Sequence, residues 1–138
     1  MKTAGYSGTP LAKKLGIKPG FGIKIVEAPE DYFSLFTDLP TDLEIVGDVE
    51  IEKDFIHYFA TSSLQLRKDV KQLKKEMVQQ GILWISWPKK TSKVATDLNG
   101  NIVREIGLAA GLVDIKVCAV NEIWSGLKFV IPVKNRKK

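Results

Sequence analysis

The chain has 138 residues, of which 44% are hydrophobic and 27% are charged, and this composition excludes disordered, collagen-like and low-complexity chains. The formal net charge of +5 is concentrated at the end of the chain, because the last five residues, KNRKK, carry four positive charges. We therefore predict a single domain over residues 1–133 and a basic tail over residues 134–138, which we expect to be solvated.

The first part of the chain predicts short elements. They are a helix over residues 9–16, a strand over residues 22–26, a helix over residues 30–36 and a strand over residues 43–47. In the first helix, Thr9 is the expected N-cap and Gly16 the expected end. The strand GIKIV is β-branched and apolar, and Pro29 after it cannot donate to a sheet.

The middle of the chain alternates apolar strands with a long helix. Residues 55–60, FIHYFA, are apolar at nearly every position, which is typical of a strand covered on both faces in a parallel sheet. Ser62 or Ser63 can cap the helix that follows. The predicted inward face of this helix consists of Leu66, Val70, Leu73 and Met77. A second buried strand is expected over residues 82–87.

The last part predicts a polar connection, a helix over residues 102–110 and two strands over residues 113–120 and 127–133. A turn that contains a glycine joins the two strands, so they are expected to form an antiparallel hairpin. Strands that alternate with helices favour right-handed crossovers. The predicted fold is therefore α/β, a Rossmann-like three-layer sandwich with a mostly parallel sheet and a C-terminal antiparallel hairpin.

Two resemblances add to this prediction. The order of elements from Asp54 to Val133 resembles the second half of a class I S-adenosylmethionine-dependent methyltransferase, with DFIHYF similar to its fourth strand and QGILWI to its fifth. Residues 5–20, 83–92 and 111–130 are similar to a family of small bacterial proteins classed only as a domain of unknown function. The first resemblance implies a methyltransferase-like order, and the second implies a bacterial setting but no catalytic residue.

The turn after the first strand departs from the cofactor-binding pattern. Methyltransferases and dinucleotide-binding folds place glycines there, so that the backbone approaches the ligand closely. Here Ala28 adds a methyl group, Pro29 removes a donor, and Glu30 and Asp31 repel an anion. We therefore predict no cofactor and interpret the protein as a non-catalytic binding or regulatory module with a degenerate methyltransferase-like fold. It is expected to act through an unknown protein partner or a small ligand.

Ligands of open α/β sheets bind beyond the carboxyl ends of the strands. The candidate rim there consists of Glu27, Thr61, Ser62, Ser63, Trp87, Lys89, Asn121, Glu122 and Trp124. Two tryptophans, hydroxyl groups, an acid and a lysine suit a small polar or aromatic ligand. The simpler interpretation also stands: the serines cap a helix, the tryptophans seal the end of the sheet, and the lysine is solvated.

Two alternatives remain open. One is an enzyme of unrecognised type at the rim, with Glu27 or His57 as base and Lys89 as electrostatic partner. The other is nucleic-acid binding through the basic tail, although nucleic acid is not the expected partner. We expect His57 to be a buried structural histidine and Cys118 a buried thiol, with no catalytic role for either.

The remaining predictions concern location and metals. No run approaches the ~20 apolar residues that span a bilayer. The first ten residues lack the apolar run of a signal peptide, so a cytoplasmic protein without membrane contact is expected. A single cysteine and a single histidine leave no Cys/His cluster, and no metal is predicted.

Overall fold

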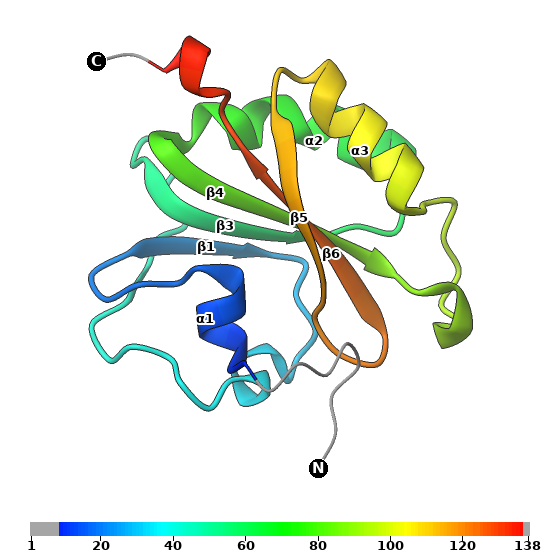
Figure 1. Ribbon diagram of the computed structural model, residues 1–138, viewed down its shortest axis with the longest axis horizontal. Coiled ribbons are helices and arrows are strands. Elements are labelled where there is room, and N and C mark those ends of the chain that lie inside the picture. The colour runs from blue at the N-terminus through cyan, green and yellow to red at the C-terminus, as the bar shows by residue number, and fades with distance from the viewer. Residues whose placement is uncertain (1–8, 137–138) are drawn as a thin grey trace.

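The computed structural model describes residues 9–136 of the chain. Its six strands form one sheet in the order β2-β1-β3-β4-β6-β5 (Figure 1). The strands are β1 (Gly22–Val26), β2 (Glu44–Ile45), β3 (Lys53–Phe59), β4 (Met77–Pro88), β5 (Val113–Ala119) and β6 (Trp124–Val130). The α-helices are α1 (Leu11–Leu15), α2 (Ser63–Lys75) and α3 (Gly100–Ala109), and the 3-10 helices are η1 (Tyr32–Leu35), η2 (Lys90–Ser92) and η3 (Val133–Asn135).

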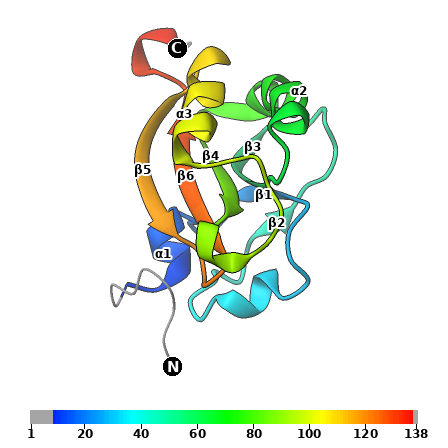
Figure 2. The same ribbon diagram turned by 90° about the vertical axis from the view of Figure 1, so that its right-hand side faces the viewer.

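The four strands β2, β1, β3 and β4 are parallel, and β6 is antiparallel to both β4 and β5. Helices α2 and α3 lie on one face of the sheet and α1 lies on the other (Figure 2). The predicted α/β, Rossmann-like three-layer sandwich with a C-terminal hairpin is confirmed. Strand β6 lies between β4 and β5.

Each face of the sheet has its own apolar core. On one face, Ile56 and Phe129 pack with Leu66 of α2 and Ile106 of α3. On the α1 face the core consists of Ala12, Leu15, Ile17, Ile23, Phe55, Trp84 and Cys118. The Trp84 indole donates to the Leu15 carbonyl at 2.7 Å, which attaches α1 to the sheet.

Several predicted boundaries differ from the structure: β6 is Trp124–Val130, not 127–133, and the predicted helix over residues 30–36 is the 3-10 helix η1. Two further differences have a clear physical reason. Strand β2 has two residues, not five, because it pairs only with Gly22 and Ile23 before the chain turns away. Met77 begins β4 and does not belong to α2. Its side chain is nevertheless buried in the same core as Leu66 and Leu73, which explains why it fitted a helical stripe.

Helix α1 does not use Thr9 as its cap. Its N-cap is Pro10, which makes no side-chain capping bond. Instead the carboxylate of Asp38 accepts from the amides of Ala12 and Lys13 at 3.0 and 3.1 Å. A residue far along the chain therefore satisfies the amides that a local cap would otherwise bond.

We expect Asp38→Ala to lower the free energy of unfolding by about 1 kcal/mol, because it removes the only side-chain acceptor that these two α1 amides have within residues 9–136. Urea denaturation measures the change. Asp42→Ala, which removes an exposed carboxylate from the same loop, serves as the control and is expected to change stability by no more than about 0.5 kcal/mol. Equal losses in the two variants would contradict the capping role.

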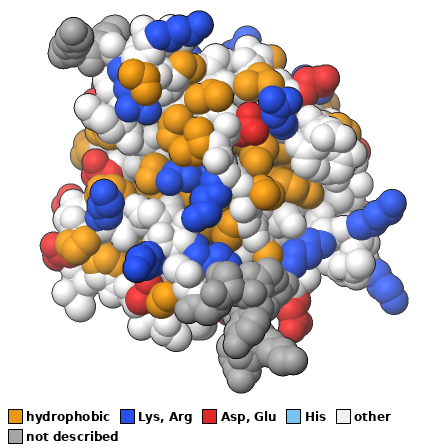
Figure 3. Space-filling model, in the orientation of Figure 1, with side chains coloured by type: hydrophobic (Ala, Val, Ile, Leu, Met, Phe, Trp, Pro, Cys, Tyr) orange, Lys and Arg blue, Asp and Glu red, His pale blue; other side chains and the backbone are white. Residues whose placement is uncertain are grey.

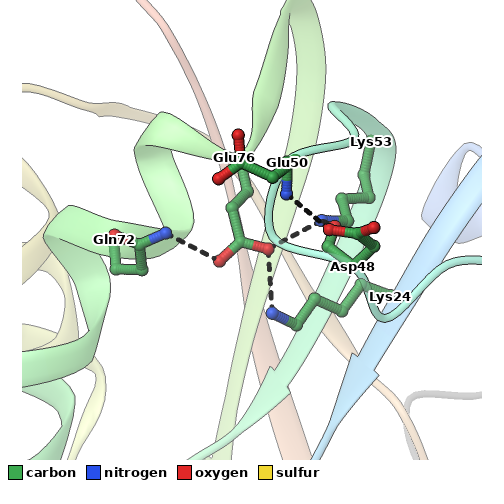
Figure 4. Close-up of polar contacts among 6 residues, drawn as sticks. All are labelled: Lys24, Asp48, Glu50, Lys53, Gln72 and Glu76. Carbon is green, nitrogen blue, oxygen red and sulfur yellow. Dashed lines mark hydrogen bonds and ion pairs between the residues drawn. The ribbon is translucent and has the colours of Figure 1, made fainter.

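A buried ionic network joins the start of β3 to the end of α2 (Figure 4). Lys53 is 0% exposed and Glu76 is 2% exposed. One carboxylate oxygen of Glu76 accepts from Lys53 at 2.7 Å and from Lys24 of β1 at 2.8 Å, and the other accepts from Gln72 at 3.1 Å. Lys53 also donates to the Asp48 carbonyl at 2.5 Å, which holds the β2–β3 loop against the sheet.

The predicted basic tail begins within η3. Arg136 donates to the Ile131 carbonyl at 2.9 Å, so this side chain is attached to the domain. Lys137 and Lys138 lie outside the described residues. Within residues 9–136, no helix combines the length and the apolar character that a membrane crossing requires.

Candidate functional site

A cleft of about 540 Å³ opens where β1 and β3 end and β6 begins. The lining side chains that bear on function are Glu27, Tyr58, Thr61, Ser62, Asp69 and Trp124. Strands β1 and β3 are adjacent and parallel, with Val26 beside Tyr58, so their carboxyl ends meet at one edge of the sheet. This is the position at which open α/β sheets bind ligands, and we call it the strand-end cleft.

Glu27 ends β1 in a left-handed backbone conformation, with φ of 56°. Few residues other than glycine adopt this conformation, and it turns the chain away from the direction of the strand. The chain then forms a turn, in which the Tyr32 amide donates to the Pro29 carbonyl at 3.0 Å, and enters η1. Glu27 lines the cleft, whereas Ala28 and Pro29 do not belong to its lining.

Tyr58 and Asp69 form a polar pair in the wall of the cleft. The Tyr58 hydroxyl donates to one carboxylate oxygen of Asp69 at 2.5 Å, and the Gln65 amide donates to both oxygens at 3.1 Å. Burial, followed by the bond to Asp69 and the charges of Asp69 and Glu27, raises the pKa of Tyr58. Tyr58 is therefore a protonated donor at neutral pH, and the Asp69 carboxylate is held in one position.

Trp124 forms the aromatic side of the cleft. Its ring meets Phe59 edge to face, with centroids 5.0 Å apart. The Asn121 side chain accepts from the amides of Ile123 and Trp124, both at 2.8 Å, and fixes the turn before β6. Asn121 therefore has a structural role, and Trp124 is a positioned, half-buried aromatic ring beside a polar cavity.

The structure brings four of the nine predicted rim residues into the strand-end cleft, namely Glu27, Thr61, Ser62 and Trp124. Ser62 also caps α2 through the Gln65 amide at 3.2 Å. Ser63 bonds the Asp97 carboxylate through its amide and its hydroxyl, at 2.9 and 2.5 Å.

The other rim residues lie elsewhere. Trp87 is 8% exposed and packs in the core under α2 and α3, on the face opposite Trp84. Lys89 lines a second cavity of about 550 Å³, which Trp87 also borders, so Glu27 and Lys89 line different cavities. Glu122 is exposed in the hairpin turn.

Sequence reasoning missed three residues of the cleft that carry polar side chains, Tyr58, Gln65 and Asp69. One signal was present: Gln65 and Asp69 are polar and four residues apart, which places them on one side of the first turns of α2. Tyr58 belongs to an apolar strand and gave no such signal.

His57 is fully buried and does not line the cleft, as predicted for a structural histidine. Its Nδ1 is 3.0 Å from the Tyr32 hydroxyl, and its Nε2 is 2.7 Å from the Ser86 hydroxyl. Burial lowers the pKa of His57 to about 3, so the ring is neutral at physiological pH.

No family model and no curated protein matches the chain. Solved structures share its fold. The magnesium protoporphyrin IX methyltransferase of Synechocystis PCC 6803 with bound S-adenosylmethionine has a TM-score of 0.56 at 11% identity, over 88% of this chain and 74% of that one. An S-adenosylmethionine-dependent methyltransferase from Aquifex aeolicus has a TM-score of 0.56 at 17% identity, over 87% of both chains. The ribosomal protein L11 methylase of Lactobacillus delbrueckii subsp. bulgaricus also has a TM-score of 0.56, at 11% identity over 91% of this chain and 74% of that one.

These neighbours confirm the methyltransferase-like architecture, and at such low identity the likeness is one of fold. They also contradict the prediction of a non-catalytic binding or regulatory module, since the structures that share this fold are S-adenosylmethionine-dependent methyltransferases. The physical reason for the error lies in the turn after β1. Ala28 and Pro29 were expected to block the ligand site, but they do not line the cleft. The chain therefore has a methyltransferase-like α/β fold with an open cleft at the carboxyl ends of β1 and β3.

Proposed function

We propose that the protein is a small methyltransferase that binds S-adenosylmethionine in the strand-end cleft. The observation that carries the proposal is the open cleft at the ends of β1 and β3, with an acid and an aromatic ring in its lining. Its volume of about 540 Å³ is within the usual range for small-molecule sites. The neighbours of similar fold support the same ligand class. We also propose that the protein is cytoplasmic, as expected from the sequence.

The charges of the cleft support this ligand. Acids near the end of β1 disfavour a phosphate, and on that ground a nucleotide fits poorly. S-adenosylmethionine instead carries a positive sulfonium, a positive amino group and one carboxylate, so its net charge is positive. The carboxylates of Glu27 and Asp69 attract both positive groups, so the acids that weigh against a nucleotide weigh in favour of this ligand.

The aromatic side chain supports it too. A tryptophan ring binds a flat base by stacking and attracts a cation over its face. Trp124 is held by Phe59 and by the Asn121 turn, so its ring needs little ordering when a ligand binds. We assign Trp124 to the adenine or the sulfonium, and Glu27 to the ribose hydroxyls or the amino group.

When bound, S-adenosylmethionine supplies a methyl group that passes from its sulfonium to a nucleophilic atom of an acceptor and leaves S-adenosylhomocysteine. The residues of the cleft contribute mainly position and charge. Tyr58 and Gln65 fix the Asp69 carboxylate, which is then available to hold a proton released by an acceptor hydroxyl or amine. Positioning two reactants in this way accounts for a large share of the rate of such reactions.

The test is isothermal titration calorimetry with S-adenosylmethionine and S-adenosylhomocysteine. We expect the wild-type protein to bind both, and Glu27→Gln to weaken S-adenosylmethionine binding by about tenfold, because a charge-assisted contact is lost. Trp124→Leu is expected to weaken both ligands, since stacking serves both.

Glu44→Gln is the matched control, because it removes an exposed carboxylate from β2, outside the cleft lining, and is expected to leave affinity unchanged. Failure of the wild-type protein to bind either compound at about millimolar concentration would contradict the proposed function.

A further inference from the structure

A cluster of lysines lies on the face of the sheet that carries α1. The register of β5 and β6 places Lys116 directly opposite Lys128. Lys116 reaches the Lys14 carbonyl of α1 at 3.3 Å, and a Cβ atom at Gly16 would lie 3.5 Å from the Lys128 ammonium. Lys18 follows α1 in the chain. Figure 3 views this face of the molecule and shows lysine and arginine side chains gathered on it.

This arrangement is unfavourable for the folded chain alone. Like charges directly opposite one another on neighbouring strands are destabilising. Burial lowers the pKa of the half-buried Lys128, and the charges of Lys116 and Lys18 lower it further. Among the described residues, none of Lys14, Lys18, Lys116 and Lys128 forms an ion pair with a carboxylate. Folding therefore brings these four lysines together, and no carboxylate within residues 9–136 forms an ion pair with them.

A cavity of about 620 Å³ adjoins the lysines. Lys13 and Lys14 of α1 line one side, and Lys116 and the buried Cys118 of β5 line the other. Burial raises the pKa of the Cys118 thiol, and the nearby positive charges of Lys14, Lys116 and Lys89 act in the opposite direction. The cavity has the size of a small-molecule site and a strongly positive wall.

We propose that this cavity, between α1 and the β5–β6 hairpin, binds a small molecule that carries phosphate. Lysine ammonium groups act as point charges toward phosphate oxygens, and several of them from separate elements suit a ligand with more than one negative charge. A phosphate bound beside Lys116 supplies a counter-charge to the Lys116–Lys128 pair, with which no carboxylate in residues 9–136 forms an ion pair. The site is separate from the strand-end cleft and does not depend on methyl transfer.

Isothermal titration calorimetry with inorganic pyrophosphate at low ionic strength tests the proposal. We expect saturable binding to the wild-type protein, and a loss of about tenfold or more in the double variant Lys116→Met/Lys128→Met. Lys14→Met gives a similar loss without a change in the hairpin. The matched control is Lys68→Met/Lys134→Met, which removes the same charge from exposed positions outside the cavity and is expected to leave affinity within about twofold.

Thermal unfolding separates binding from folding defects. Because Lys116→Met/Lys128→Met removes a repulsion, its Tm without pyrophosphate is expected to equal or exceed that of the wild-type protein, while the increase in Tm caused by pyrophosphate is lost. The proposal is overturned if that increase persists in the double variant, or if the control variant loses it equally. Tighter binding of a thymidine decanucleotide than of pyrophosphate, through the same lysines, would overturn the assignment to a small molecule.

Discussion

Glu76→Gln is expected to lower the free energy of unfolding by about 3–5 kcal/mol, the usual effect of breaking a buried ion pair. The fully buried Lys53 loses its carboxylate partner in this variant, and Lys24 loses the same partner (Figure 4). The network also holds the β2–β3 loop through Asp48, so the loss extends beyond one contact. Urea denaturation at neutral pH measures the change.

Two further variants test whether this loss of stability comes from the buried ion pairs of Glu76. Glu50→Gln, at an exposed position of the same loop, is expected to change stability by no more than about 0.5 kcal/mol. The double variant Glu76→Gln/Lys53→Met is expected to recover part of the loss, because it also removes the unpaired buried charge. If Glu76→Gln is as stable as the wild-type protein, the network contributes nothing to the free energy of unfolding.

The ion pairs of Glu76 also depend on pH. Burial opposes ionisation of this carboxyl group, but the bonds from Lys24, Lys53 and Gln72 outweigh it and hold the pKa of Glu76 below its usual value. A group whose pKa is lowered on folding stabilises the protein above its unfolded pKa. The contribution of Glu76 is therefore complete above about pH 4.5 and is lost as the pH falls through the lower folded value.

The second large effect concerns His57. Its folded pKa of about 3 lies below its ordinary value of 6.5, so the unfolded chain takes up the proton first as the pH falls. The contribution of His57 to the free energy of unfolding is therefore complete above about pH 6.5. As the pH falls toward about 3, this contribution declines by up to about 1.4 kcal/mol per pH unit. We expect His57→Gln to remove this part of the pH dependence, because glutamine does not titrate.

The measurement is the free energy of unfolding in urea between about pH 4 and about pH 7, for wild type and variant. His57→Gln is also expected to be less stable at neutral pH, since Tyr32 and Ser86 lose a matched partner in the core. The informative quantity is therefore the slope with pH. An identical slope in the two proteins would contradict the burial of a neutral His57.

The strand-end cleft shows how much of a candidate site can be predicted from local sequence patterns. The rule that ligands bind at the carboxyl ends of strands selected Glu27 and Trp124, which the structure places in one cleft, because strand boundaries are readable from apolar runs. The structure places Trp87 and Lys89 outside this cleft, because whether a residue after a strand faces a given cleft or a core depends on the packing above it.

The error about function has a similar origin. Ala28 and Pro29 were judged by their chemistry alone, as obstacles to a ligand at the turn after β1. Their position depends on the backbone of Glu27, whose left-handed conformation directs the chain away from the cleft. A single sequence seldom reveals a left-handed residue other than glycine, since local sterics disfavour it and only the surrounding structure stabilises it.

By itself, the sequence determined the α/β class, the central buried strand β3, the cap of α2 to one of two neighbouring serines, and the closing hairpin. These features follow from apolar periodicity and from capping residues within a few positions of one another. Only the tertiary structure decided that Asp38 caps α1, that Glu76 pairs with Lys24 and Lys53, and that Lys116 faces Lys128. These contacts join residues 12 to 52 positions apart, and their energies depend on burial and strand register, which local patterns do not contain.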